Sequence, residues 1–385
     1  MQVSLYRFMA GIYIHIPFCK QACHYCDFHF STNLENRAAI VQALSEELVL
    51  QRDYLGVEAV NTLYFGGGTP SVLTPRELDQ ILDTVHKTFS VNSLAEVTLE
   101  ANPDDLSREK LKALRQAGIN RLSVGIQSFD DTVLKFLHRA HDATLAKRCI
   151  SDAYEVGFQN ISLDLIYAIP DQDEVVWERN IEEALRLKPQ HISSYSLTIE
   201  EKTTFGRWAA KGKLTPVNDD TAGHQLLVLV DRLERAGFEQ YEVSNFSLPG
   251  FQSKHNSSYW RSEKYLGVGP SAHSYNGVSR QFNVSNNAFY LKALQERRIP
   301  ATIEVLTRED QINDYLLTTL RTSWGTDLAR ILSLWGYDLL AAHEGYIGAL
   351  VENGHALLEG RVLRLTKNGK LLADKIASDL FLLTP

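Results

Sequence analysis

Short runs rich in β-branched and aromatic residues alternate, over the first half of the chain, with stretches in which apolar residues recur every three or four positions. The first pattern is typical of buried strands and the second of amphipathic helices of about ten to 17 residues. The sequence therefore predicts six strand–helix units. The expected strands are GIYIHI, NTLYFG, AEVTLEA, NRLSVGI, QNISLDLIYAI and QHISSYSLTI.

Three helix ends carry the same signal. The stretches RQAGINRLSVG, YEVGFQNISLD and ERAGFEQYEVS each place a glycine where a left-handed C-terminal cap is expected, and then begin a strand. Such regular β/α units favour a parallel, barrel-like sheet over a doubly wound one. We therefore expect an α/β fold, a partial TIM-like barrel of six β/α units.

The texture of the sequence changes after the sixth unit, where polar, aromatic and turn-rich stretches follow. We expect three parts: a barrel over 1–245, a connecting region over 246–300 and a small C-terminal domain over 301–385. Within the last part, the sequence predicts helices over 307–322 and around 326–350, a short β wing over 355–366 and a helix over 367–383.

Composition and charge narrow the function classes. The chain has 385 residues and a formal net charge of -8, which argues against a surface built to coat nucleic acid. Neither a secretory signal nor an apolar run long enough to span a membrane is found, so we expect a cytoplasmic protein. A peripheral membrane contact and a homodimer are both compatible with the sequence.

Polar or flexible residues follow the expected strands at the ends where parallel β/α proteins carry their chemistry. GGGTP at 66–70 follows the second strand, Glu100 and Gln127 end the third and fourth, and Asp164 interrupts the fifth. Taken singly, each has an ordinary explanation as a turn, a cap or a helix-start charge. Their common location favours one functional site.

Three of the four cysteines, Cys19, Cys23 and Cys26, follow the first strand, and Pro17 favours a wrapped loop there over a helix. A structural zinc is one interpretation, with His15, His24 or His29 as the fourth ligand. The other is a [4Fe-4S] cluster, in which three thiolates leave one iron open to a non-protein ligand. Cys149, in a helix-like stretch, reads as a small buried hydrophobe.

The spacing C-x-x-x-C-x-x-C after a first strand resembles the radical S-adenosylmethionine (SAM) superfamily. More narrowly, IHIPFC, YFGGGTP, EANP, GIQSFD and LDLIYAIP resemble the oxygen-independent coproporphyrinogen III oxidase family over about residues 12–275. The resemblance implies a cluster on the three cysteines with SAM at the open iron. It also implies a SAM site made of Tyr13, Tyr25, Gly67, Gly68, Thr69, Glu100, Gln127, Arg139 and Asp164, and a small winged-helix-like C-terminal domain.

Two departures point to one branch of that family. The oxidases carry a further cysteine where this chain has Phe28, and a longer segment ahead of the cluster cysteines. Both differences resemble the haem chaperone (HemW-like) branch, for which oxidase activity is not expected. The stretch HNSSYW resembles a haem-binding motif of that branch and makes His255 the expected iron ligand, with His273 as a second candidate. The ordinary alternative is a histidine hydrogen-bonded within a loop.

The sequence thus predicts a protein that binds a [4Fe-4S] cluster, SAM and haem, and delivers haem to acceptor proteins. One alternative is oxidative decarboxylation of a coproporphyrinogen propionate to a vinyl group. Another is a zinc-stabilised nucleic-acid interaction module. Nucleic acid is not expected as a partner, because acidic and basic residues are mixed in the C-terminal part.

Overall fold

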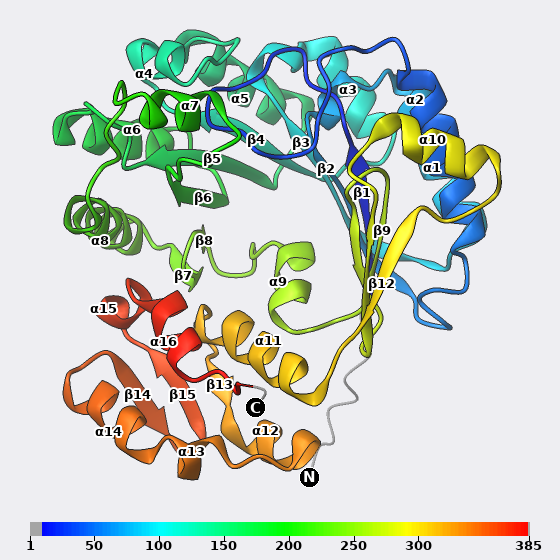
Figure 1. The fold of residues 1–385 in the computed structure, drawn as a ribbon. Helices are drawn as coiled ribbons and strands as arrows, with labels where there is room; N and C mark the ends of the chain where they lie inside the picture. The colour runs from blue at the N-terminus through cyan, green and yellow to red at the C-terminus, as the bar shows by residue number, and fades with distance from the viewer. Residues whose placement is uncertain (1–9, 384–385) are drawn as a thin grey trace.

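The computed structural model describes residues 10–383, and its framework is one 12-stranded sheet (Figure 1). Six parallel strands stand in chain order at its centre. These are β1 (Ala10–Ile16), β2 (Val60–Gly67), β3 (Val91–Ala101), β4 (Arg121–Gln127), β5 (Ile161–Tyr167) and β6 (His191–Ser196). Over the described residues the outermost strands, β12 and β7, do not pair with each other, which confirms a partial rather than a closed barrel.

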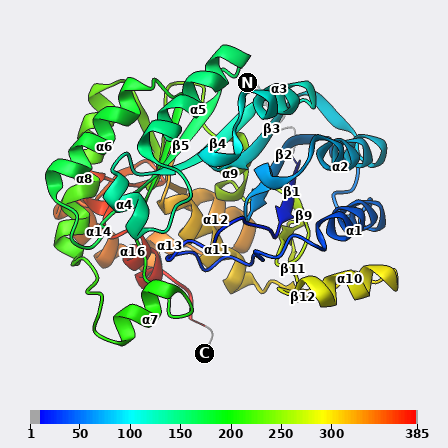
Figure 2. The same ribbon diagram turned by 90° about the horizontal axis from the view of Figure 1, so that it is seen from above.

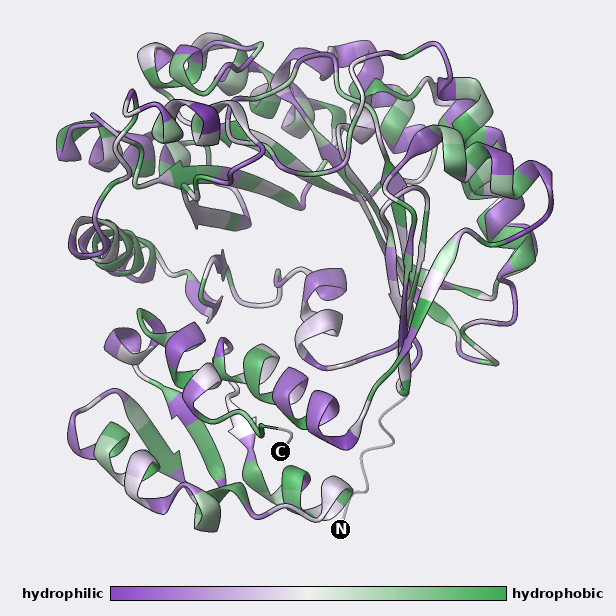
Figure 3. Ribbon diagram, viewed as in Figure 1, coloured by the Kyte–Doolittle hydropathy of each residue, from purple (hydrophilic) through white to green (hydrophobic). Residues whose placement is uncertain are grey.

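Helices follow the parallel strands and surround them on the outside, as Figure 2 shows from above. They are α1 (Arg37–Leu50), α2 (Pro75–Thr88), α3 (Arg108–Gln116), α4 (Asp131–Phe136), α5 (Ala143–Val156) and α6 (Glu174–Arg186). Helix α2 illustrates the pattern, because its buried residues Leu78, Ile81, Leu82 and Val85 recur at helical spacing. Along such helices hydrophobic and hydrophilic segments alternate in Figure 3.

The predicted glycine caps are confirmed. Gly118, Gly157 and Gly237 have φ angles of 99°, 99° and 87°, in the left-handed region that favours glycine. Each glycine ends the helix before it, and a short connection leads from it into the next strand. The chain therefore returns to the sheet at the positions that the sequence predicts.

Antiparallel strands extend the sheet at both sides of the parallel core. On the β6 side lie β8 (Asn245–Ser247) and β7 (Glu239–Glu242), while on the β1 side lie β9 (Tyr265–Val268), β10 (His273–Tyr275), β11 (Ser279–Asn283) and β12 (Ala301–Val305). Strand β9 pairs parallel to β1, and the three that follow are antiparallel. The intervening helices are α7 (Thr204–Ala210), α8 (Asp219–Arg235), α9 (Lys254–Trp260) and α10 (Asn287–Gln295).

The C-terminal part packs around an apolar cluster of its own, drawn from residues 312–380. It comprises α11 (Arg308–Leu320), β13 (Thr326–Asp327), α12 (Leu328–Trp335), α13 (Leu339–Ala342), α14 (Glu344–Glu352), β14 (Ala356–Glu359), β15 (Val362–Leu365), α15 (Lys367–Lys370) and α16 (Ala373–Asp379). Strands β14 and β15 form the predicted wing. The domain boundaries stay predictions, although β12, just beyond the one at 300, pairs with β11.

The helix expected over 367–383 is wrong in one respect, because the structure divides it into α15 and α16. Gly369 lies in the first piece, where an added Cβ would come within 1.9 Å of the His355 carbonyl oxygen. Glycine is a poor helix former, and this close approach fixes the short helix against the wing. None of the helices in residues 10–383 is both long and apolar enough to cross a bilayer.

The two faces of the parallel strands differ sharply. The face toward the helices carries buried apolar residues such as Ile12, Leu63, Leu99, Leu122 and Leu163. Because side chains alternate along a strand, their neighbours point to the inside of the partial barrel. These inward residues are Tyr13, Thr62, Tyr64, Glu96, Thr98, Glu100, Arg121, Ser123, Ser162, Asp164, His191, Ser193 and Tyr195. A packed parallel barrel is normally filled with branched apolar residues, so this polar interior marks a place for ligands.

A buried carboxylate ties the β1 side of the sheet to its helices. Glu47 of α1 is 0% exposed and accepts hydrogen bonds from Tyr290 Oη at 2.6 Å, Asn283 Nδ2 at 2.7 Å, Gly269 N at 2.8 Å and Gln51 Nε2 at 2.9 Å. Burial raises the pKa of this carboxyl group. The four donors offset the cost of burying it, and they connect α1 with α10, β11 and the loop after β9.

We expect Glu47→Ala to lower the free energy of unfolding by about 3 kcal/mol or more, because it leaves several buried donors without an acceptor. Chemical denaturation followed by circular dichroism measures this. The matched control is Glu46→Ala, one position along the same helix and exposed, which we expect to change stability by less than about 0.5 kcal/mol. Equal effects of the two substitutions would contradict a structural role for the buried carboxylate.

Candidate functional site

Two cavities lie inside the partial barrel and share a wall. The larger, of about 490 Å³, is called here the cysteine cavity, and the smaller, of about 370 Å³, the aromatic cavity. Their shared wall is made of Tyr64, Glu100, Tyr195 and Asn256. Among the residues predicted from sequence, those lining the cysteine cavity are Cys19, Cys23, Tyr25, Cys26, Gly67, Gly68, Thr69, Glu100, Gln127, Arg139 and Asp164. The other two, Tyr13 and His255, line the aromatic cavity.

The three cysteines lie in a loop between β1 and α1 that contains no helix, as predicted. Backbone hydrogen bonds close the base of this loop, with Cys19 N donating to Ser31 O at 3.0 Å and Ser31 N to Pro17 O at 2.9 Å. Burial raises the pKa of the Cys19 thiol to about 11 and that of Cys26 to about 12. Cys149 is buried in α5, away from the other cysteines, as expected of a small hydrophobe.

Two side chains donate hydrogen bonds to cysteine sulfurs. Thr69 Oγ1 lies 3.2 Å from Cys19 Sγ, and Arg139 Nη1 lies 3.2 Å from Cys23 Sγ. Such donors stabilise the thiolate form, which is the form that binds metal. At Cys19 the hydrogen bond from Thr69 acts against the effect of burial on the pKa.

The structure does not favour the zinc alternative. Within residues 10–383, no set of three His, Cys, Asp or Glu side chains could hold a single metal ion. His15 Nε2 lies 2.9 Å from His29 O, and His24 Nδ1 lies 3.0 Å from Phe136 O. These histidines are thus engaged in contacts other than a tetrahedron with the cysteines.

Glycines let the backbone after β2 pass close to the cysteine loop. Gly67 has a φ of 105°, and a Cβ there would lie 2.7 Å from the His15 ring. A Cβ at Gly68 would lie 2.6 Å from Phe18 O. A larger residue would collide with His15 of β1 at position 67 and with the start of the cysteine loop at position 68, so the glycines leave a backbone cradle beside the cavity. Such a cradle fits a ligand recognised by main-chain groups.

Two carboxylates, from strands β3 and β5 on either side of β4, face the cysteine cavity. Glu100 accepts a hydrogen bond from Tyr64 Oη at 2.7 Å, and Asp164 accepts one from Ser123 Oγ at 3.2 Å. Burial is the main cause that raises the pKa of Glu100 to about 7 and that of Asp164 to about 6. Gln127, at the end of β4, has a positive φ of 66°, which a non-glycine residue rarely adopts.

Arg139 is drawn into the cavity wall rather than lying on a solvated helix end. Besides Cys23, its guanidinium donates to Tyr25 Oη at 3.3 Å, Asn102 Oδ1 at 2.6 Å and Gly125 O at 2.8 Å. Sequence reasoning assigned no role to Asn102, although it lies in the motif EANP. Its position directly after a strand that ends in Glu100 is the signal that could have found it.

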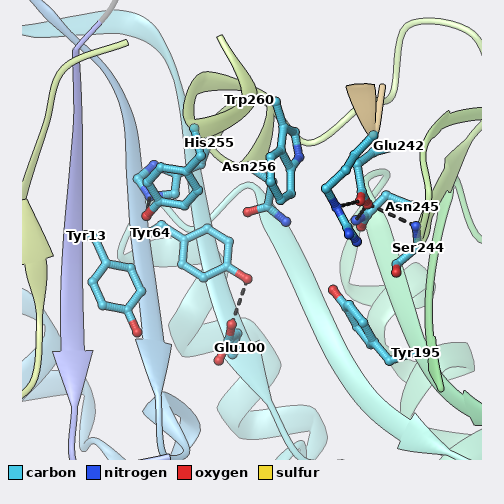
Figure 4. Close-up of a pocket in the computed structure, with 12 residues that line it drawn as sticks. Tyr13, Tyr64, Glu100, Tyr195, Glu242, Ser244, Asn245, His255, Asn256 and Trp260 are labelled. Carbon is cyan, nitrogen blue, oxygen red and sulfur yellow. Dashed lines mark hydrogen bonds and ion pairs between the residues drawn. The ribbon is translucent and has the colours of Figure 1, made fainter. Parts of the chain in front are cut away.

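The aromatic cavity places rings on two facing walls (Figure 4). Tyr13, Tyr64 and His255 lie on one side, and Tyr195 lies opposite, near Glu242. Tyr195 is 46% exposed, and the space it faces is this cavity. Sequence reasoning missed Tyr64 and Tyr195, although both stand at inward positions of predicted strands.

His255 is enclosed in the wall of the aromatic cavity. Its side chain is 0% exposed, with Nδ1 2.8 Å from Thr62 Oγ1 and Nε2 2.7 Å from Tyr259 Oη. The imidazole stacks on Tyr64 at a centroid distance of 4.9 Å. Burial lowers the pKa of His255 to about 3, so the ring is neutral at pH 7. Both nitrogens are engaged, and the assignment of this residue to haem iron stays a prediction.

The far end of the aromatic cavity carries a charged pair. Glu242, which is 1% exposed, accepts from Arg321 Nε at 3.1 Å and from Asn245 Nδ2 at 2.6 Å. The Arg321 guanidinium lies 5.9 Å from the centroid of the Trp260 ring. Trp260 Nε1 is buried and has no hydrogen-bond partner in the described part of the chain. Arg321 also pairs with Asp374, so this end offers an aromatic surface, a free donor and a guanidinium that is paired with two carboxylates.

Comparison with known proteins gives a consistent result. The radical SAM superfamily profile matches residues 13–184. The protein named heme chaperone HemW from Bacillus subtilis is 37% identical over 372 residues, covering 96% of this chain and 98% of that protein. Heme chaperone HemW from Escherichia coli is 38% identical, covering 68% and 69% respectively. The structure of coproporphyrinogen III oxidase (HemN) from Escherichia coli superposes with a TM-score of 0.84 at 23% identity, covering 97% of this chain and 90% of that one.

The raised pKa of Glu100 makes stability depend on pH. Because the folded state holds the proton up to about pH 7 and the unfolded carboxyl group releases it near its usual value of about 4.3, stability falls as pH rises between these values. The substitution Glu100→Gln removes the ionisable group and with it this loss of stability at higher pH. We expect the variant to gain roughly 1–3 kcal/mol relative to the original chain between pH 5 and pH 8, measured by urea unfolding.

The control for this measurement is Glu46→Gln, because Glu46 is exposed on α1. Its difference from the original chain should not change with pH. A constant difference for Glu100→Gln over the same range would show that Glu100 ionises at its ordinary pKa.

Proposed function

The chain belongs to the radical SAM superfamily and, within it, to the family of the haem chaperones HemW, and from this premise we propose that it binds haem beside an iron–sulfur site and delivers it to acceptor proteins. The observation that carries the proposal is the aromatic cavity, which shares a wall with the cysteine cavity. Flat aromatic walls with an arginine at one end suit a planar, carboxylate-bearing ligand such as haem.

The superfamily implies a [4Fe-4S] cluster and SAM, and the cysteine cavity fits both. Cys19, Cys23 and Cys26 converge on one space, and Arg139 and Thr69 already donate to two of their sulfurs. When bound, the cluster supplies an electron and an iron with an open position that SAM can chelate. The three cysteines would hold the cluster. The glycine cradle and Gln127 would orient SAM on its remaining sides.

The carboxylates of Glu100 and Asp164 would bind the ribose of SAM. Glu100 and Asp164 are hydrogen-bond acceptors that would hold ribose hydroxyl groups. Tyr64 and Ser123 fix the two carboxylates through their hydroxyl groups. Tyr25 and Arg139 line the side of the cavity next to the cysteines and are joined by a hydrogen bond.

The predicted iron ligand His255 requires a local rearrangement. A neutral imidazole binds iron through a nitrogen lone pair, and Nε2 is held by the hydroxyl of Tyr259. Ligation at Nε2 therefore requires Tyr259 to move, while Thr62 can keep Nδ1 protonated and the ring oriented. His273, the second candidate, is exposed on β10 and does not line the aromatic cavity.

The oxidase alternative is less well supported. Phe28, which stands where the oxidases carry a further cysteine, is 68% exposed and lines the mouth of the cysteine cavity. Relatives with 35–37% identity over most of this chain are named haem chaperones. The likeness to HemN, at 23% identity, shows the fold alone.

The reducing conditions that free cysteines require support the cytoplasm as the compartment.

The haem site can be tested by titrating the cluster-loaded protein with haemin and following the Soret band. We expect Trp260→Ala and Tyr195→Ala each to weaken haemin binding about tenfold or more, because each removes an aromatic wall of the cavity. Phe289→Ala is the matched control, since Phe289 is 65% exposed on α10 and lies outside both cavities. Equal affinity in all four proteins would place haem elsewhere.

Delivery needs a separate measurement. Haem-loaded protein mixed with an apo-globin should lose its Soret band as the globin gains one, at a rate faster than free haemin exchange from albumin. With coproporphyrinogen III, SAM and a reductant under anaerobic conditions, we expect no protoporphyrinogen. Formation of that product would make the protein an oxidase.

The role of His255 is tested by a pair of substitutions. If Nε2 binds iron, Tyr259→Phe should strengthen haemin binding severalfold, because it removes the hydroxyl that competes for this nitrogen. His255→Ala should then weaken binding and shift the Soret band while the cluster content stays unchanged. A Soret band that is the same with and without His255 would remove this residue as a ligand.

A further inference from the structure

Arg139 makes a contact that SAM binding does not explain. Its Nη1 lies 3.2 Å from Cys23 Sγ, so the guanidinium directly contacts one of the three sulfurs that the superfamily uses to hold iron. The resemblance predicts instead that this arginine pairs with the SAM carboxylate. A residue that touches the sulfur acts on the cluster even when SAM is absent.

The guanidinium is fixed in this orientation by neutral partners. Nη2 donates to Asn102 Oδ1 at 2.6 Å and to Gly125 O at 2.8 Å, and Nη1 also donates to Tyr25 Oη at 3.3 Å. None of these groups carries a charge that would neutralise the arginine. Asp104 also acts electrostatically on Arg139, but the hydrogen bond from Nη1 goes to Cys23 Sγ, a group that becomes anionic when it holds iron.

We propose that Arg139 sets the reduction potential of the cluster by donating a charge-assisted hydrogen bond to the sulfur of Cys23. Reduction adds one electron to the cluster, and the negative charge that it brings is shared with the sulfur ligands. A cation and an N–H donor at a sulfur stabilise the reduced form more than the oxidised one. Arg139 thus acts as a positioning residue for electron uptake, with dithionite as the electron source in the test below.

Two neighbouring groups show why Arg139 is the residue of interest. Thr69 donates to Cys19 at 3.2 Å, but its hydroxyl is neutral, so its effect on the potential is smaller. Lys20 is a cation next to Cys19 in sequence, yet its ammonium group pairs with Asp105 and Asp104. Lys20 therefore pairs with carboxylates, whereas Arg139 donates a hydrogen bond directly to Cys23 Sγ.

The test is a potentiometric titration of the reconstituted cluster without SAM, with the reduced form followed by electron paramagnetic resonance. We expect Arg139→Gln to shift the reduction equilibrium at least tenfold toward the oxidised form, which is a fall in midpoint potential of 59 mV or more for a one-electron couple. Lys20→Gln is the matched control, because it removes a nearby cation that contacts no sulfur. We expect it to leave the potential within a threefold change.

Equal midpoint potentials in Arg139→Gln and the original chain, at equal iron content, would overturn the proposal and leave SAM binding as the role of this arginine. If Arg139→Gln binds no cluster, the midpoint potential of Arg139→Lys tests the proposal. A lysine keeps the charge but loses the fixed planar donor, so its potential should fall below that of the original chain. A midpoint potential of Arg139→Lys equal to that of the original chain would contradict a role for the hydrogen bond. If the original chain itself binds no cluster, this proposal is overturned together with the cluster of the proposed function on which it rests.

Discussion

The alternation of side chains along the six parallel strands is the constraint on which the rest of this structure depends. One face of each strand must be apolar, because helices cover it, and the other face is then free to carry polar groups only if something other than packing fills the interior. An open sheet meets this condition, since strands β12 and β7 at its two ends leave the inside unclosed over the described residues. Both cavities lie against that polar inner face, and loop and helix residues such as the three cysteines, Arg139 and Trp260 complete them.

Burying so many polar groups needs compensation, and the structure supplies it through opposite charge. Glu100 and Asp164 have raised pKa values because of burial, and Arg121, which is 1% exposed at the start of β4, acts against this rise at both carboxylates. Its Nε has no hydrogen-bond partner among the described residues. The arginine thus serves as a fixed positive charge beneath the carboxylates, which lowers the cost of ionising them near pH 7.

Much of this arrangement could be predicted from the sequence, because it depends on local signals. Gly118 and Gly157 mark helix ends by their left-handed backbone, and the spacing of Cys19, Cys23 and Cys26 predicts a metal or cluster site without reference to the fold. The contact between Arg139 and Cys23 could not be predicted, because 116 positions separate the two residues and only the β1 and β4 loops bring them together. The burial of His255 could not be predicted from the sequence either, because it depends on Thr62, in a strand 193 positions away.

The wall between the two cavities gives their separation a physical meaning. Glu100 faces the cysteine cavity and accepts a hydrogen bond from Tyr64, whose ring stacks on His255 in the aromatic cavity. A ligand hydroxyl that donates a hydrogen bond to Glu100 would share this carboxylate with Tyr64, and a shift of Tyr64 would change the surface against which His255 packs. Because protein interiors are close-packed, such a shift is not absorbed locally. The hydrogen bond between Tyr64 and Glu100 is therefore the direct link between the two cavities.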